Sequence, residues 1–186
     1  MLTLRQLAPL VLAALALSSP RRGAADTVVL VVRHAEKSAP TGDVPLSAAG
    51  EARAQVLVGI AREAGVSAII TTQFQRTRQT AAPSAEALGV VPDVAEVKGG
   101  VPDHVKAIAD LVRGRFAGRT VLIVGHSNTV PAIVNALGGR KLPDLCDDSY
   151  DDLFTVVLSA DGAGRLIHSR YGAPSTATAA CPAIMK

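Results

Sequence analysis

The chain has 186 residues, of which 48% are hydrophobic and 19% charged, and its formal net charge is +3 at pH 7. This length suits one domain with a sizeable core, and this composition excludes a disordered or collagen-like chain. The only charged side chains of residues 1–25 are Arg5, Arg21 and Arg22. Without them, 16 basic residues face 16 acidic ones. The domain itself therefore gives no electrostatic reason to bind nucleic acid.

The first 25 residues have the pattern of an export signal. One arginine precedes an apolar run over 7–17, which is shorter than the roughly 20 residues of a membrane-spanning helix. Gly23 and Ala25 place small side chains before a cleavage site that follows Ala25. A buried first helix is disfavoured, because the run is apolar on every face. We predict a signal peptide over 1–25, a mature domain over 26–186, and a periplasmic or secreted protein without stable membrane insertion.

The chain contains two cysteines, Cys146 and Cys181, whose spacing matches no zinc motif. In an exported protein such a pair most simply forms one disulfide. We therefore predict a bond that closes a loop of about 36 residues and ties the C-terminal tail to the domain.

Beyond the leader, short apolar runs alternate with segments of helical period. The continuous β-branched run over 27–32 is typical of a strand that is buried on both faces. Ser47 can cap a helix that continues to about Ala64 and stops at Gly65. One face of this helix is predicted to carry the residues spaced four apart, which are Ala52, Val56, Ile60 and Ala64.

The alternation continues to the end of the chain. We predict a strand over 68–71, a helix over 77–88 interrupted or bent at Pro83, a weak strand over 90–97, a helix capped by Asp103, a strand over 121–124 and a helix over 129–137. Two further strands, 154–158 and 165–170, form a hairpin around Asp161 and Gly162. The order predicts a single three-layer α/β/α domain on a mostly parallel sheet, with an antiparallel strand near the end.

Unusual polar residues follow three of these strands. Arg33 and His34 come directly after the first strand, Arg76 follows the second, and His126 follows the strand over 121–124. Ligands of such sheets bind outside the carboxyl ends of the strands, so we expect these side chains to meet. A lone histidine there is more often structural, but two histidines with arginines and helix N-termini are suited to a phosphate.

The same residues carry a resemblance to a known family. The segment 31–36 resembles the Arg-His-Gly signature of the histidine phosphatase (phosphoglycerate mutase-like) superfamily, with an alanine in place of the glycine. The segment 45–50 resembles its Leu-Thr-x-x-Gly segment, 71–81 is similar to its second-arginine motif, and 125–127 matches its second-histidine motif. The ordered match covers residues 27–170.

The resemblance implies a role for each of the four residues. His34 would be the nucleophile that forms a phosphohistidine, and Arg33 and Arg76 would clamp the phosphoryl oxygens. His126 would donate to the same oxygens. The family uses no metal in this step, so the resemblance implies a phosphatase without metal or cofactor, and the leader pattern implies that it is exported. Its substrate would be a phosphorylated small molecule or a phosphoprotein. The short interval between Arg76 and His126 is more similar to the compact phosphohistidine phosphatases than to the mutases.

No motif marks a general acid. Family members that cleave phosphomonoesters usually carry a carboxyl between the second arginine and the second histidine, where this chain offers Glu86, Asp93, Glu96, Asp103 and Asp110. Two of these fall within predicted helices, and capping would lower the pKa of Asp103. Of the remaining carboxyls, Glu96, near a strand end, is the best candidate acid, with Glu36 as a further possibility. We predict a weak or absent acid and a preference for good leaving groups.

Two other interpretations stay open. The first is a phosphate-binding module that has lost catalysis, which the retention of all four residues disfavours. The second is a metal-dependent hydrolase that uses His34, Glu36 and His126, but the chain lacks an HExxH or PCxxC companion motif. An acidic run, interpreted as a solvated loop without assigned function, consists of Asp144, Asp147, Asp148, Asp151 and Asp152.

Overall fold

The computed structural model describes residues 25–175. Nearly all of the predicted signal peptide and Cys181 lie outside these residues, so the export signal, its cleavage and the disulfide stay predictions.

In chain order the elements are β1 (Thr27–Arg33), α1 (Ala48–Glu63), β2 (Ala68–Thr71), α2 (Gln75–Leu88), β3 (Asp93–Val94), α3 (Val101–Arg113), β4 (Thr120–Gly125), α4 (Thr129–Ala136), β5 (Asp152–Leu158) and β6 (Gly164–Arg170). Among the described residues, no helix is long and apolar enough to cross a membrane.

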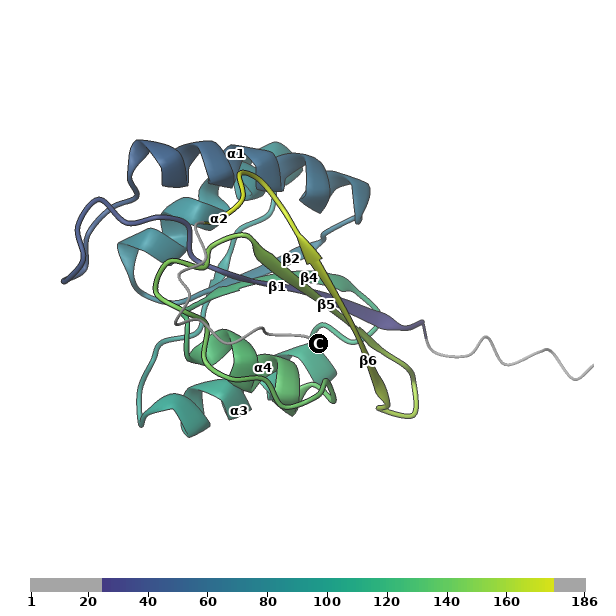
Figure 1. The fold of residues 1–186 in the computed structure, drawn as a ribbon. Coiled ribbons are helices and arrows are strands. Elements are labelled where there is room, and N and C mark those ends of the chain that lie inside the picture. Colours follow the sequence, from purple (N-terminus) through teal and green to yellow (C-terminus); the bar gives the residue numbers. More distant parts are fainter. Residues whose placement is uncertain (1–24, 176–186) are drawn as a thin grey trace, which may run out of the picture.

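The strands form one sheet in the order β3-β2-β4-β1-β5-β6. β1, β2, β3 and β4 run parallel to one another. β5 pairs antiparallel with β1, and β6 pairs antiparallel with β5. Figure 1 shows α1 and α2 on one face of this sheet and α3 and α4 on the other. The predicted three-layer α/β/α domain on a mostly parallel sheet is confirmed, and β5 is its antiparallel strand.

The central strand β1 is buried on both faces because its apolar side chains alternate between two cores. Val29 and Val31 join the core under α3 and α4. Leu30 and Val32 join the core under α1 and α2. β1 and β4 therefore lie in the middle of the sheet, and their carboxyl ends open on the same edge.

The predicted face of α1 is only partly its buried face: Ile60 and Ala64 pack against the core, but Ala52 and Val56 are exposed. Ser47 caps the helix as predicted, because its Oγ accepts a hydrogen bond from the backbone of Gly50. Val56 is 47% exposed, however, and the buried positions are Gly50, Arg53, Ala54, Leu57 and Ala61. A Cβ at Gly50 would lie 2.3 Å from the Glu36 carbonyl oxygen. Gly50 is therefore on the inward face, where the chain after β1 leaves no room for a side chain.

Two predicted element starts also differ. α3 begins at Val101 after Gly100, whose φ of 94° suits glycine, so Asp103 lies within the first turn and is not the cap. β3 spans two residues, not the predicted 90–97. Beyond it, the backbone N–H of Val97 donates to the side chain of Gln73 and so leaves the strand ladder. α2 runs unbroken through Pro83.

Candidate active site

His34 lies directly after β1, and its backbone N–H donates to the Gly125 carbonyl at the end of β4. The side chain is 3% exposed. Its Nδ1 lies 2.8 Å from the Ala35 carbonyl oxygen. Because a carbonyl can only accept, Nδ1 carries the proton and Nε2 keeps a free lone pair. Burial lowers the pKa of His34 to about 3, and the neighbouring Arg33 and His126 act in the same direction. The ring is therefore neutral at pH 7.

His126, after β4, presents the opposite arrangement. Its ring centroid lies 5.5 Å from that of His34. Arg76 donates from Nη2 to Nδ1 of His126 over 3.3 Å, and a guanidinium cannot accept, so this Nδ1 is unprotonated. The proton is on Nε2, which donates to Thr72 Oγ1 over 3.1 Å. Burial, followed by the charge of Arg76, lowers the pKa of His126 to about 3.

Thr72 was not singled out from the sequence, although it lies within the second-arginine motif. It is buried, and its Oγ1 lies 2.9 Å from Thr77 Oγ1. Thr77 in turn donates to the Phe74 carbonyl over 2.9 Å. Because the Thr77 hydroxyl already donates its hydrogen to that carbonyl, it can only accept from Thr72. The Thr72 hydroxyl therefore donates to Thr77 Oγ1 and accepts from Nε2–H of His126. The two hydroxyls thus fix the proton of His126 on Nε2.

Arg33 is 2% exposed and is held by the loop that precedes β5. Its Nη1 donates to the Cys146 carbonyl over 2.6 Å and to the Ser149 carbonyl over 3.1 Å. The guanidinium carbon lies 4.2 Å from the centroid of the Tyr150 ring, an aromatic residue that the sequence did not mark. Burial lowers the pKa of Arg33 from its usual value, but an arginine stays a cation in proteins.

Arg76 lies in the first turn of α2. Its guanidinium carbon is 4.6 Å from the centroid of the Phe74 ring. Its Nη1 is 3.7 Å from Asp43 Oδ1, and the same oxygen accepts from the Gln75 backbone N–H. The helix start and the loop after β1 therefore hold this second arginine beside His126.

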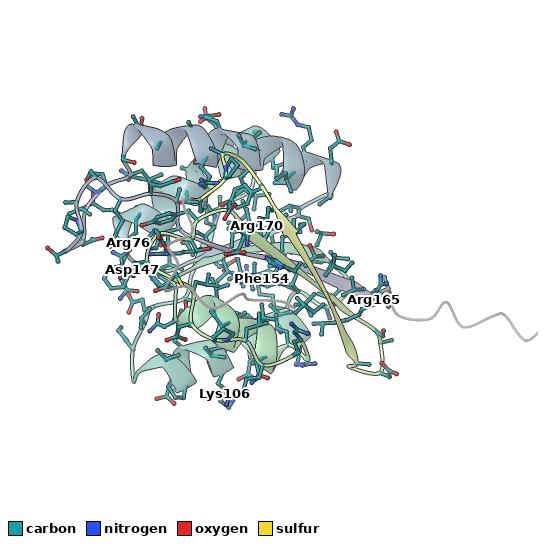
Figure 2. All side chains as sticks on the ribbon, in the orientation of Figure 1. Arg76, Lys106, Asp147, Phe154, Arg165 and Arg170 are labelled. Atoms are coloured by element: carbon teal, nitrogen blue, oxygen red, sulfur yellow. The ribbon has the colours of Figure 1, made fainter. Side chains whose placement is uncertain are left out.

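All four predicted residues line one cavity of about 430 Å³. The other lining residues are Lys37, Phe74, Val97, Val101, Ser127, Asn128, Thr129 and Asp147. Figure 2 shows Arg76 and Asp147 at one end of the sheet and Arg165 at the opposite end. Two larger cavities beside α2 contain none of the four residues. The cationic side chains of Arg33, Lys37 and Arg76 can bind an anion in this cavity. The unprotonated Nε2 of His34 would then lie beside the anion as a nucleophile.

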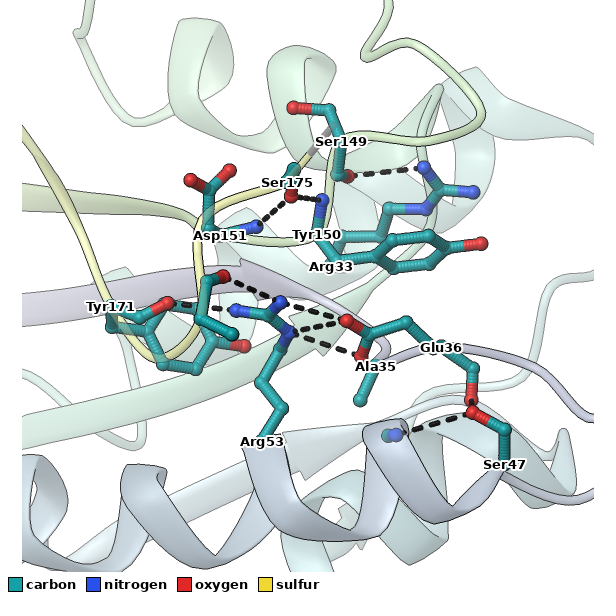
Figure 3. Close-up of polar contacts among 12 residues, drawn as sticks. Arg33, Ala35, Glu36, Ser47, Arg53, Ser149, Tyr150, Asp151, Tyr171 and Ser175 are labelled. Carbon is teal, nitrogen blue, oxygen red and sulfur yellow. Dashed lines mark hydrogen bonds and ion pairs between the residues drawn. The ribbon is translucent and has the colours of Figure 1, made fainter. Parts of the chain in front are cut away.

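The structure does not bring the candidate acids into this cavity. Glu96 is absent from its lining, and its carboxylate pairs with Lys98. Glu36 binds the buried Arg53, whose Nη2 donates to Oε1 over 2.7 Å (Figure 3). Within 25–175, no group of three or more His, Cys, Asp or Glu side chains is arranged to hold a metal ion. The carboxylate that does line the cavity is the exposed Asp147, 3.9 Å from Arg33 Nη2.

The acidic run is divided by the structure. Asp147 is fully exposed, as predicted for a solvated loop. Asp151 and Asp152 are buried and form ion pairs with Arg170 of β6. Asp152 also accepts from Ser149 Oγ over 2.6 Å. These two acids therefore belong to the packing of the loop against the sheet.

A family model for the histidine phosphatase superfamily, branch 1, matches residues 29–101. No curated protein sequence gives a significant match. The protein histidine phosphatase SixA, solved with tungstate, has a TM-score of 0.61 and 17% identity, over 77% of this chain and 96% of that one.

Two mycobacterial structures are similar to the same extent. The glucosyl-3-phosphoglycerate phosphatase with inorganic phosphate has a TM-score of 0.60 and 16% identity, over 79% of this chain and 97% of that one. Mycobacterial hydrolase 2 has a TM-score of 0.61 and 16% identity, over 83% and 94%.

At these identities the likeness concerns the fold. The family model covers 29–101, less than half of the chain, and together with the shared fold it supports the resemblance to the histidine phosphatase superfamily. In fold it is similar to the compact SixA type that the short interval before His126 had indicated.

Proposed function

We propose that this protein is an exported, metal-independent phosphatase that hydrolyses its substrate through a phosphohistidine on His34. One observation carries the proposal: the unprotonated Nε2 of His34 shares a cavity with Arg33, Arg76 and His126. The Ala35 carbonyl holds the proton on Nδ1, and burial keeps the ring neutral. A neutral imidazole with a fixed tautomer is a competent nucleophile.

The reaction takes two steps. In the first, the Nε2 lone pair of His34 forms a bond to phosphorus while the bond from phosphorus to the leaving atom breaks. The electron pair of the broken bond leaves with that atom. In the second, water attacks the phosphohistidine, the water loses a proton to solvent, and the nitrogen regains its lone pair as phosphate departs. Arg33 and Arg76 offset the charge on the phosphoryl oxygens in both steps.

His126 becomes a hydrogen-bond donor to the phosphoryl group only when the anion is bound, because the anion promotes protonation of its Nδ1. Without ligand, its Nδ1 accepts from Arg76. A phosphate dianion in the cavity raises the pKa of His126, because the negative charge favours the protonated ring. Nδ1 then carries a proton and donates to a phosphoryl oxygen, while Nε2 keeps its bond to Thr72.

The substrate class follows from the placement of the candidate acids, since the carboxylate that lines the cavity is the fully exposed Asp147. Neither Glu96 nor Glu36 reaches the cavity. A leaving group of high pKa needs a proton from an acid within hydrogen-bond reach. We expect the enzyme to favour phosphohistidine or aryl phosphates over sugar phosphates, on a phosphoprotein or a small molecule. One solved relative in fold is named a protein histidine phosphatase.

The decisive experiment is an acid-quench assay with ³²P-labelled substrate on the mature protein, with and without EDTA. We expect an acid-labile phosphoenzyme in wild type, its absence in His34→Ala, and turnover that EDTA does not change. Loss of activity with EDTA would contradict the proposal. Phosphate binding without any turnover would instead indicate the non-catalytic binding module.

The proposal also covers the export of the protein. The leader pattern over 1–25 and the pair Cys146 and Cys181 support it. N-terminal sequencing of protein from its native compartment should begin at Asp26. A cytosolic product that still starts at Met1 would contradict export. Alkylation of both thiols in unfolded, unreduced protein would exclude the disulfide.

A further inference from the structure

A loop far from the family-matched segment holds the guanidinium of Arg33. We call residues 145–151 the Arg33 loop. Its carbonyls at Cys146 and Ser149 both accept from Nη1, and the ring of Tyr150 lies against the guanidinium plane. Nη1 therefore has its acceptors within the protein, and the ring restricts rotation of the group.

The remaining edge of the guanidinium is available to a ligand, with the exposed Asp147 at 3.9 Å from Nη2. The buried Nε of Arg33 has no hydrogen-bond partner within the described part of the chain, and Arg33 lines the cavity beside His34. A buried donor without a partner is costly, so a site that keeps one is suited to an anion that satisfies it. Nε and Nη2 form the two-donor edge that matches a phosphoryl group.

The Arg33 loop is itself fixed from the C-terminal side. Ser175 Oγ accepts from the backbone N–H of Tyr150 over 2.8 Å and from that of Asp151 over 3.1 Å (Figure 3). A hydroxyl oxygen has two lone pairs, so one side chain satisfies both donors. Successive N–H groups bound to one atom fix the backbone immediately after Ser149, whose carbonyl holds Arg33.

The segment that carries Ser175 is anchored to α1. Arg53 donates from Nη1 to the Tyr171 carbonyl and from Nη2 to the Ala173 carbonyl, each over 2.8 Å. The same guanidinium binds Glu36, two residues after the proposed nucleophile. Figure 3 shows the contacts of Arg53 with Glu36 and Tyr171 next to the contacts that Ser175 makes with Tyr150 and Asp151.

We propose that Ser175 is a positioning residue of the phosphate site, which holds the Arg33 loop so that Arg33 presents Nε and Nη2 to the phosphoryl group. The inference rests on the proposed function, because it takes Arg33 as a ligand of the phosphate. Ser175 does not touch the substrate and acts through Tyr150 and the Ser149 carbonyl.

The test is a double-mutant cycle read out by calorimetric titration with inorganic phosphate. Ser175→Ala should weaken phosphate binding about fivefold to tenfold, whereas Ser175→Thr, which keeps the hydroxyl, should bind as wild type does. Ser169→Ala on β6 is the matched control, because the hydroxyl lies 3.5 Å from the Leu153 carbonyl of β5, outside the Arg33 loop. In an Arg33→Ala background, Ser175→Ala should have no further effect. Arg33→Lys, which keeps the charge but not the fork, serves if Arg33→Ala does not fold.

The outcomes separate the two proposals. An equal loss of affinity from Ser175→Ala with and without Arg33 would overturn the positioning role, since the effect would not pass through that arginine. Wild-type affinity in Ser175→Ala would overturn it as well. Failure of the wild-type protein to bind phosphate would overturn the proposed function and the inference together. Thermal midpoints of all variants show whether any loss of binding reflects unfolding.

Discussion

The ends of β1 and β4 present two buried histidines with opposite proton positions. His34 faces the Ala35 carbonyl and is protonated on Nδ1. His126 faces Arg76 with Nδ1 and is protonated on Nε2. Burial lowers the pKa of both rings to about 3. The comparison teaches that the partner of one ring nitrogen, not burial, decides whether a histidine is suited to attack or to donate.

The largest effect is expected from removing the attacking ring. His34→Ala should lower kcat about a thousandfold or more, because the covalent step has no substitute nucleophile. The assay is hydrolysis of p-nitrophenyl phosphate, with far-UV circular dichroism to verify folding. Turnover of His34→Ala near the wild-type level would show that His34 is not the nucleophile.

A smaller loss is expected from the groups that only stabilise charge. His126→Ala, Arg33→Ala and Arg76→Ala should each lower kcat about a hundredfold, as removal of one transition-state donor does. Arg165→Ala, at the opposite end of the sheet, is the control and should leave kcat unchanged. If His126→Ala were as severe as His34→Ala, the distinction between donor and nucleophile would be wrong.

The shared burial of the two rings predicts acid lability. Since the folded-state pKa of each is about 3 and an unfolded histidine titrates near 6.5, the unfolded chain binds more protons between these values. Stability is therefore complete above pH 6.5 and falls as the pH drops towards 3, by about 3 kcal/mol per histidine at pH 4.5. Urea unfolding at pH 7 and 4.5 measures this loss.

The matched variant tests the origin of that pH dependence. His34→Asn combined with His126→Asn should show a smaller loss between pH 7 and 4.5 than wild type, although it will be less stable at pH 7. An unchanged pH dependence would mean that carboxylates such as Asp151 account for the acid lability. Burial opposes ionisation of Asp151, but its bonds to Ser175 and Arg170 lower its pKa overall.

The smallest effect concerns the hydroxyl that fixes the tautomer of His126. Thr72→Val keeps the shape but removes the acceptor of Nε2–H, so kcat should fall about tenfold, the worth of one hydrogen bond. Thr72→Ser should retain most activity. The pH profile of kcat should shift in Thr72→Val only, because the valine changes the proton affinity of His126. A shift of equal size in both variants would assign Thr72 to packing.

That Arg33, His34, Arg76 and His126 would line one cavity could be predicted, because each lies at or shortly after the end of a strand whose apolar run is plain in the sequence. β1 and β2 are continuous runs of aliphatic residues, and strand ends of a parallel sheet share one edge. Helical period alone assigned the face of α1 only in part, because it did not reveal the close backbone approach at Gly50. The acid search failed for a similar reason. Glu36 and Glu96 are near the site in sequence but have partners of their own, Arg53 and Lys98.

Other features of the site have no local signal at all. Thr72 acts on His126 from a different strand end, 54 positions away. Tyr150 and Ser175 act on Arg33 from segments more than a hundred residues further along the chain. Neither motif nor period encodes such contacts, because they depend on how β5 and the C-terminal segment pack against β1.

The main-chain carbonyl contacts of Arg33 determine which sequence changes the Arg33 loop can tolerate. Every residue type supplies a main-chain carbonyl, so the side chains at 146 and 149 can change while the guanidinium stays in place. Loop length has no such freedom, because a deletion between these positions moves both acceptors at once. We expect related chains to differ in residue type over 145–149 but to have the same number of residues there. A position-by-position comparison would overlook a feature that is kept as spacing alone.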